Sequence, residues 1–315
     1  MTRKIFLTAM AVICLAISSS AQEFISPSGT YLYEKRDTCD LFLDIYYPAK
    51  GSVTHIDGKE KPTVVFMFGG GFITGERDNE FYNKWFRQLT ENGYGVVSID
   101  YRLGLKGADK VGVAQTNLLD KAIHMAVEDL FSATNFLIEN APELNINPDN
   151  LVVSGSSAGA ISVMQAEYEI ANRTAWSKVL PEDFNYVGVM SFAGAIFSRE
   201  GKIDFKTAPC PTMMLHGTAD TIVPYTQIAI LNLGFFGGGK LVDRFKKYDL
   251  NYNMYHFIDY GHEIAGSMDT TLDLQIKFLE NNVMKGNKRI VETWISDPDI
   301  HKGSSLKSRK ELYGN

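Results

Sequence analysis

Val152 to Ala160 decide the fold, with the sequence Val-Val-Ser-Gly-Ser-Ser-Ala-Gly-Ala. Two β-branched residues lead into a Gly-x-Ser-x-Gly motif, and an alanine-rich helical sequence follows. The pattern predicts a nucleophile elbow, a strand-to-helix turn so tight that Gly155 and Gly159 stand where a Cβ would clash. The turn would hold the Ser157 hydroxyl above the sheet edge at a helix N-terminus, where backbone N–H groups stabilise negative charge. Because about one chain in ten of this length matches the motif by chance, its partners must also be found.

Strands and amphipathic helices alternate along the rest of the chain. A hairpin is expected ahead of the main core, with strands at 30–35 and 41–47. The apolar run 62–68 is typical of a strand buried on both faces of a parallel sheet. Further strands are expected at 93–101, 186–192, 211–216 and 252–258, and helices at 79–92, 117–139, 160–171 and 270–283. This alternation predicts an α/β fold with a mostly parallel, doubly wound sheet flanked by helices, and ligands at the carboxyl ends of its strands.

A serine hydroxyl is a poor nucleophile at neutral pH, so Ser157 needs a histidine base and a carboxylate that orients the base. After a nucleophile elbow, the acid precedes the histidine in the chain. Five of the six histidines fit other places: His55 in a loop, His124 on a helix, His301 in the tail, His256 inside a strand pattern, and His216 ahead of any suitable acid. His262 remains, in a loop just beyond the last expected core strand, where a base is needed.

The expected acid is Asp220, which follows the strand at 211–216. In the loop beyond the carboxyl end of that strand, its carboxylate would accept the Nδ1–H of His262. An Asp here could also cap a helix that begins near Pro224, but the ordered serine and histidine on either side favour the catalytic role. Glu263 is the fallback acid, although it adjoins His262 and is badly placed to reach the far ring nitrogen.

Three consecutive glycines, Gly69 to Gly71, follow directly after the apolar run at 62–68. The tetrahedral intermediate of acyl transfer carries an oxyanion, and the N–H groups of a glycine-rich loop can approach it without a side-chain clash. We assign the oxyanion donors to Gly70, Gly71 and Ala158. The glycines could also form a simple turn, but three in a row are more than a turn needs.

With these residues in place, the chain resembles the α/β-hydrolase superfamily, and within it the carboxylesterases related to hormone-sensitive lipase and the bacterial acetylxylan and feruloyl esterases. The resemblance covers about residues 41–284 and rests on the stretches 68–72, 98–103, 155–159, 216–220 and 261–262. In the second stretch, Asp-Tyr-Arg-Leu, Arg102 is expected in a buried ion pair. Members of this family usually have His before the three glycines. Phe68 stands there instead, so the oxyanion loop must be braced in another way, such as by packing.

The two ends of the chain differ from the core. Residues 1–21 combine the basic pair Arg3 and Lys4, an apolar run and small residues before a cut, which predicts a signal peptide and an exported, periplasmic or secreted protein. A membrane anchor would need a longer apolar run, and the residues before Cys14 are too large for a lipoprotein signal. Residues 22–284 would form the catalytic domain. Residues 285–315 are polar and are expected to pack on it or trail from it without chemistry.

The resulting expectation is a serine carboxylesterase that needs no cofactor and no metal. Ser157 would attack an ester carbonyl, His262 would carry the proton, and Asp220 would fix the tautomer of the ring. The resemblance alone implies acetyl or feruloyl esters of plant polysaccharide, so the expected partner is a small-molecule or oligosaccharide ester. Phe72, Tyr101 and Tyr225 are candidates for the residues that line its pocket.

Other classes of function stay open. A serine peptidase or aminopeptidase of the prolyl-oligopeptidase type shares this catalytic domain, but no propeller-sized segment precedes it here. A non-catalytic, hydrolase-like binding protein would have no reason to keep an ordered triad, and a lipase would want a more apolar lid than the loop 104–115. The formal net charge of −6, which falls to −8 without Arg3 and Lys4, argues against nucleic acid or an anionic membrane as partner. The oligomeric state stays open.

Overall fold

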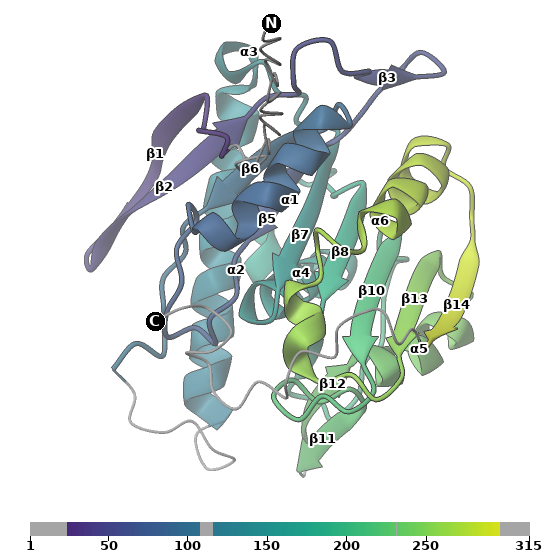
Figure 1. The fold of residues 1–315 in the computed structure, drawn as a ribbon. Helices are drawn as coiled ribbons and strands as arrows, with labels where there is room; N and C mark the ends of the chain where they lie inside the picture. The colour runs from purple at the N-terminus through teal and green to yellow at the C-terminus, as the bar shows by residue number, and fades with distance from the viewer. Residues whose placement is uncertain (1–23, 108–115, 231, 297–315) are drawn as a thin grey trace, which may run out of the picture.

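The computed structural model describes residues 24–107, 116–230 and 232–296 (Figure 1). The predicted signal peptide, most of the predicted loop 104–115 and the end of the chain lie outside the described residues. Within the described ranges, no helix is both long and apolar enough to cross a bilayer.

A nine-stranded sheet forms the centre of the fold, in the order β1-β2-β6-β5-β7-β8-β10-β13-β14. Its strands are β1 (Gly29–Arg36), β2 (Cys39–Tyr46), β5 (Thr63–Met67), β6 (Gly95–Ile99), β7 (Leu151–Ser156), β8 (Gly188–Phe192), β10 (Thr212–Gly217), β13 (Tyr252–Phe257) and β14 (Ile290–Ile295). Strand β2 pairs antiparallel with both of its neighbours, β1 and β6, and the strands from β6 to β14 in this order run parallel to one another. The predicted mostly parallel sheet and its leading hairpin are confirmed.

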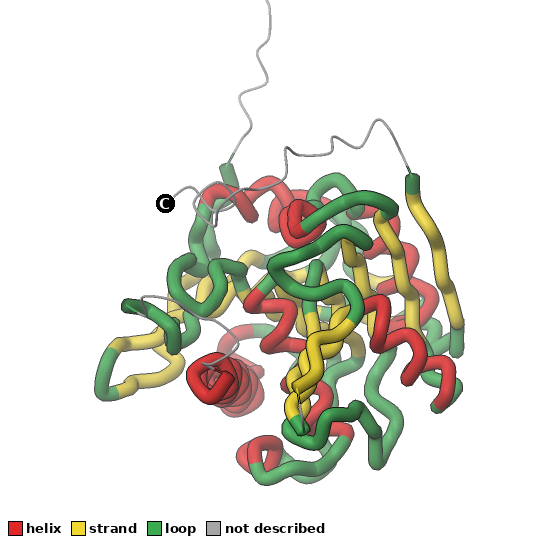
Figure 2. Tube along the Cα trace, turned by 90° about the horizontal axis from the view of Figure 1, so that it is seen from below, coloured by secondary structure: helices red, strands yellow, loops and turns green. Residues whose placement is uncertain are grey.

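Helices cover both faces of this sheet, as Figure 2 shows with strands between helices on either side. They are α1 (Glu80–Glu91), α2 (Thr116–Glu139), α3 (Ala141–Leu144), α4 (Ala158–Ala171), α5 (Gly238–Lys247) and α6 (Leu272–Phe278), with a π-helical segment at Leu279–Met284 and 3₁₀ helices at Trp176–Val179 and His262–Gly266. On one face α1 and α6 are joined by Trp85, whose Nε1 donates to Oε1 of Gln275 at 2.7 Å. On the other face α2 packs against α4 (Figure 1).

The positions of the apolar residues along β5 and α1 explain how the helices pack on the sheet. Val64 to Met67 on β5 are fully buried because helices lie over both faces of the strand. Helix α1 begins after Asn79, whose side chain accepts the N–H of Phe81 and so caps the first turn. The inward face of α1 carries Tyr82, Trp85 and Phe86, and all three rings pack edge-on against Phe66 of β5.

Two small sheets were not expected from the sequence. The strands β9 (Ala195–Ser198), β12 (Leu233–Gly237) and β11 (Gln227–Ile230) form an antiparallel sheet, and β3 (His55–Ile56) pairs with β4 (Lys59–Glu60) in the loop after β2. Helix α5 was also missed. Each of these strands has two to five residues, so its alternation of apolar and polar residues is too brief to stand out.

The polar tail predicted after Met284 differs from the structure. Residues 290–295 form β14, which pairs in parallel with β13 over its full length. The domain therefore extends beyond the predicted boundary at residue 284. All six residues of β14 are partly or fully exposed, although Ile290, Val291, Trp294 and Ile295 are apolar. The strand is joined to the sheet by its pairing with β13 and by the ring of Trp294, which stacks on that of His256 with centroids 4.1 Å apart.

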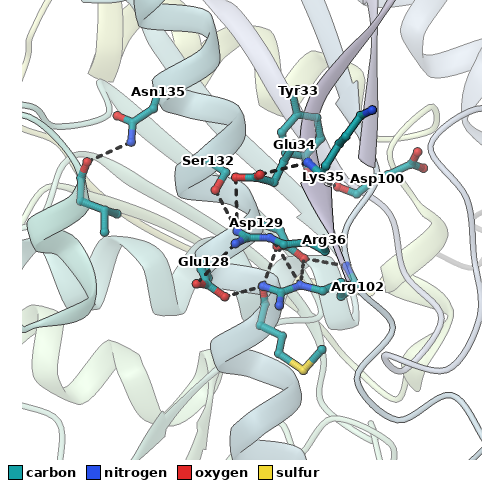
Figure 3. Close-up of polar contacts among 12 residues, drawn as sticks. Tyr33, Glu34, Lys35, Arg36, Asp100, Arg102, Glu128, Asp129, Ser132 and Asn135 are labelled. Carbon is teal, nitrogen blue, oxygen red and sulfur yellow. Dashed lines mark hydrogen bonds and ion pairs between the residues drawn. The ribbon is translucent and has the colours of Figure 1, made fainter. Parts of the chain in front are cut away.

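An ion-pair network ties the leading hairpin to α2 (Figure 3). Asp129 of α2 is completely buried, and it accepts the backbone N–H of Arg102 at 2.7 Å and the Nε–H of the same residue at 2.9 Å. The Nε of Arg36, on β1, lies 3.3 Å from Asp129, and the more exposed Glu128 pairs with both arginines. The buried ion pair expected for Arg102 is confirmed, and it anchors the chain just beyond β6.

Removal of the Asp129 carboxylate is predicted to destabilise the fold. The substitution Asp129→Ala leaves Arg36 and Arg102 without their buried partner, and breaking a buried pair costs about 3–5 kcal/mol. As the control, Glu128→Ala removes the exposed partner and should lower the free energy of unfolding by less than about 1 kcal/mol. Urea unfolding followed by circular dichroism measures both losses. Equal losses would contradict the central role of Asp129.

Candidate active site

Ser157 stands between β7 and α4 with φ 50° and ψ −112°, a backbone conformation that side-chain-bearing residues rarely adopt. Two glycines permit this turn. A Cβ at Gly155 would lie 2.3 Å from the carbonyl carbon of Gly159, and a Cβ at Gly159 would lie 2.1 Å from the carbonyl oxygen of Met67. The predicted need for both glycines is confirmed, because β7, α4 and β5 touch through their backbones.

Three side chains predicted as catalytic lie in one hydrogen-bonded row. The Oγ of Ser157 lies 2.7 Å from Nε2 of His262, and Nδ1 of His262 lies 2.7 Å from Oδ2 of Asp220. Ser157 follows β7, Asp220 follows β10, and His262 opens the 3₁₀ helix that follows β13, so all three stand beyond the carboxyl ends of parallel strands. The contact partner of Nδ1 is Asp220 and not the fallback acid Glu263. The arrangement can transfer a proton from a serine to a histidine that a carboxylate orients.

Four donors surround the carboxylate of Asp220. Its Oδ1 accepts the N–H groups of Ile222 and Val223 at 2.9 and 3.0 Å, a cap-like arrangement. Its Oδ2 faces His262 and also lies 3.3 Å from Nε2 of His216. Burial by itself would raise the pKa of the Asp220 carboxyl, but hydrogen bonds from the two histidines outweigh burial and hold the pKa well below its usual range. The group is therefore a fixed carboxylate at neutral pH.

His216 received no role from the sequence, because it precedes the acid in the chain. The spacing His-x-x-x-Asp at the end of a strand is the signal that could have found it. The turn after β10 folds Asp220 back toward the strand, since the N–H of Asp220 donates to the carbonyl of Gly217 at 3.2 Å. A side chain at the end of β10 therefore meets a side chain four residues later.

The predicted oxyanion loop adjoins the elbow, since a Cβ at Gly159 would also lie 2.6 Å from the carbonyl oxygen of Phe68. Gly70 has φ 127°, and a Cβ there would overlap the carbonyl oxygen of Thr74. Among the described residues, none accepts a hydrogen bond from the N–H of Gly70 or Gly71, and Ala158 begins α4, where N–H groups lack acceptors within the helix. Three donors are thus available beside Ser157, and their role in catalysis stays a prediction.

Phe68 braces the oxyanion loop from the place where the family usually has histidine. Its ring stacks on that of Tyr101 with centroids 4.4 Å apart, and the Tyr101 hydroxyl donates to the Phe68 carbonyl at 2.9 Å. On the next residue, the N–H of Gly69 donates to the Tyr82 hydroxyl at 3.0 Å. Aromatic packing and two hydroxyl groups therefore hold the loop.

The residues predicted to line the substrate pocket are engaged elsewhere. Phe72 and Tyr101 are 1% and 3% exposed, and the Tyr225 hydroxyl lies 2.6 Å from Nδ1 of His256. Such burial does not favour contact with a substrate, although the roles of these residues stay predictions. The direction of a ring cannot be read from its position in the sequence.

Parts of the chain are similar to known proteins. Residues 43–176 match the family model BD-FAE. The non-reducing polyketide synthase ausA of Emericella nidulans is 30% identical over 164 residues, which cover 48% of this chain and 6% of that protein. Gut esterase 1 of Caenorhabditis briggsae is 30% identical over 122 residues, which cover 39% of this chain and 21% of that protein. The chain therefore spans a minor part of the length of these relatives.

Solved structures of similar fold cover most of the chain. The native structure of the esterase Est2 from Thermogutta terrifontis has a TM-score of 0.55 and 22% identity, covering 80% of this chain and 91% of that one. The structure of that esterase phosphonylated by cyclosarin has a TM-score of 0.56 and 21% identity, covering 82% of this chain and 95% of that one. The likeness establishes the α/β-hydrolase fold.

Adding a methyl group at Gly159 is predicted to disrupt the elbow. In Gly159→Ala the new carbon would overlap the carbonyl oxygens of Met67 and Phe68, which cannot move unless α4 shifts away from β5. We expect a loss of about 1–3 kcal/mol in the free energy of unfolding and slower reaction of Ser157 with a fluorophosphonate. The control Ser162→Ala, which removes only a hydroxyl bonded within α4, should change neither. Wild-type stability and reactivity in Gly159→Ala would show that the close approach is not required.

Proposed function

We propose that this protein, which has the α/β-hydrolase fold and matches BD-FAE over residues 43–176, is a serine carboxylesterase that works through an acyl-enzyme. The proposal is carried by the row in which Ser157 Oγ, His262 and Asp220 follow one another at 2.7 Å. The similarity to gut esterase 1 and to Est2 supports an ester as the substrate.

The mechanism follows from the hydrogen bonds of His262. Because Asp220 holds the proton on Nδ1, Nε2 is the free base and takes the hydroxyl proton as Oγ of Ser157 attacks the ester carbonyl. The carbonyl oxygen becomes an oxyanion that the N–H groups of Gly70, Gly71 and Ala158 stabilise. His262 then gives the proton to the leaving alcohol. A water molecule, activated by the same ring, attacks the acyl-enzyme, and the acid and the free serine are released.

We propose acetyl and feruloyl esters of plant polysaccharide as the candidate class of substrates. The resemblance of the sequence motifs to acetylxylan and feruloyl esterases supports this choice. Structures of Est2 have been obtained with propionate and with butyrate bound, and both are short carboxylates. The two other candidates, a peptidase and a non-catalytic binding protein, are separated from an esterase by the measurements below.

A fluorophosphonate probe should label the wild-type protein at Ser157, and Ser157→Ala should abolish labelling. The same variant should lower kcat by a factor on the order of 10⁴ or more, because the hydroxyl is the attacking group. The control Ser156→Ala removes the neighbouring hydroxyl, which donates to the Ala265 carbonyl, and should still be labelled. Nitrophenyl acetate, butyrate and octanoate, methyl ferulate and acetylated xylan define the acyl preference. Faster cleavage of aminoacyl amides would favour a peptidase, and an unlabelled wild-type protein would favour a binding protein.

We also propose that residues 1–21 direct export, on the basis of their basic pair, apolar run and small residues before Gln22. Expressed in a bacterium, the full-length chain should be recovered from the periplasm or medium with Gln22 as its first residue, as mass spectrometry can show. A chain lacking residues 2–21 should stay in the cytoplasm. Recovery of both proteins uncleaved in the cytoplasm would contradict export.

A further inference from the structure

A second buried histidine contacts the carboxylate of the triad. His216 lies on β10 and is 1% exposed, and its Nε2 is 3.3 Å from Oδ2 of Asp220. The same oxygen lies 2.7 Å from Nδ1 of His262. One carboxylate oxygen is therefore shared by two imidazole rings.

Hydrogen bonds on the far side of His216 define its tautomer. The backbone N–H of Gly238 donates to Nδ1 at 3.3 Å, and a ring nitrogen that accepts a hydrogen bond carries no proton. The ring hydrogen therefore sits on Nε2. Besides Asp220, the carbonyl oxygen of Val223 lies 3.1 Å from this nitrogen, so the Nε2–H is shared between a carbonyl and a carboxylate.

The ring of His216 is enclosed on its other sides. Gly238 begins α5, and a Cβ on it would lie only 3.2 Å from Nδ1 of His216, so the helix start touches the ring. The ring of Tyr225 packs edge-on at a centroid distance of 5.7 Å. His216 is thus held in place with its Nε2 3.1 Å from the Val223 carbonyl oxygen and 3.3 Å from Oδ2 of Asp220.

We propose that His216 is a positioning residue for the catalytic acid: its Nε2–H fixes Oδ2 of Asp220 in the orientation that accepts the Nδ1–H of His262. The inference rests on the proposed serine hydrolase function. Without His216, the N–H groups of Ile222 and Val223 would still hold Oδ1, but His262 alone would hold Oδ2, and the carboxylate could turn about its Cβ–Cγ bond. The turned carboxylate would stabilise the transition state less, because His262 is positively charged there. Substrate binding would be unaffected, because His262 is neutral at that stage.

Two substitutions of His216 distinguish the role of its Nε2–H donor from the role of the other ring atoms. In His216→Gln the amide reaches the place of Nε2 and keeps a donor for Asp220. In His216→Asn the amide reaches only the place of Nδ1 and keeps the contact with Gly238. We expect His216→Asn to lower kcat for nitrophenyl acetate on the order of tenfold with little change in KM, and His216→Gln to stay within about threefold of wild type.

His256→Asn is the matched control. His256 pairs with His216 in the sheet register, is 2% exposed, and contacts Tyr225 and Glu292. Its replacement should leave kcat at the wild-type value. A fall in kcat equal to that of His216→Asn would overturn the proposal, because loss of any buried histidine from this part of the sheet would then suffice.

Proton NMR provides a readout that needs no substrate. The proton between His262 and Asp220 should give a far-downfield signal in the wild type and in His216→Gln, and His216→Asn should broaden it or move it upfield. An unchanged signal and kcat in His216→Asn would overturn the proposal, as would equal kcat losses in both His216 variants. If the wild type hydrolyses no ester but its signal still depends on the donor at residue 216, the proposed function fails and the positioning role stands.

Discussion

The geometry of the site depends on one backbone contact, where Gly159 at the start of α4 meets the end of β5. Only a residue without a Cβ lets the helix approach this closely. The contact brings the turn at Ser157 against the loop that carries Gly70 and Gly71, so the nucleophile and the candidate oxyanion donors are placed by main chain alone. The unusual conformation of Ser157 is held at both ends, because its N–H donates to the Phe192 carbonyl at 2.9 Å and its own carbonyl accepts the N–H of Ile161 at 2.8 Å.

Two of the buried carboxylates, those of Asp129 and Asp220, are satisfied in different ways. Asp129 is matched by the guanidinium groups of Arg36 and Arg102, so its charge is neutralised and its task is to hold segments together. Asp220 is surrounded by backbone N–H groups and imidazole rings. Neutral donors orient a carboxylate without cancelling its charge, and in the proposed mechanism this charge stabilises the positive ring of His262 after it takes the serine proton.

Sequence patterns predicted the parts of this structure that depend on burial or on chain order. The buried strand β5 and the inward face of α1 have strong apolar periods, and the order of Ser157, Asp220 and His262 follows from the elbow. Strand β14 was missed because its four apolar residues stand in a stretch that is otherwise polar and charged, and β9, β11 and β12 were missed because they are short. The roles of Phe68 and His216 depend on which side chains meet across the sheet edge, and periodicity carries no information about such contacts.

The order of the strands also bears on when reactivity arises during synthesis. Ser157 leaves the ribosome 105 residues before His262. Strand β13, which precedes His262, pairs with β14 only after residues 290–295 have also been made. Pairing between parallel strands distant in sequence is slow. In the proposed mechanism, a growing chain therefore presents Ser157 without its base, and the hydroxyl is not activated until nearly all of the sheet has assembled. If residues 1–21 direct export as proposed, a chain exported unfolded would bring Ser157 and His262 together only after it has crossed the membrane.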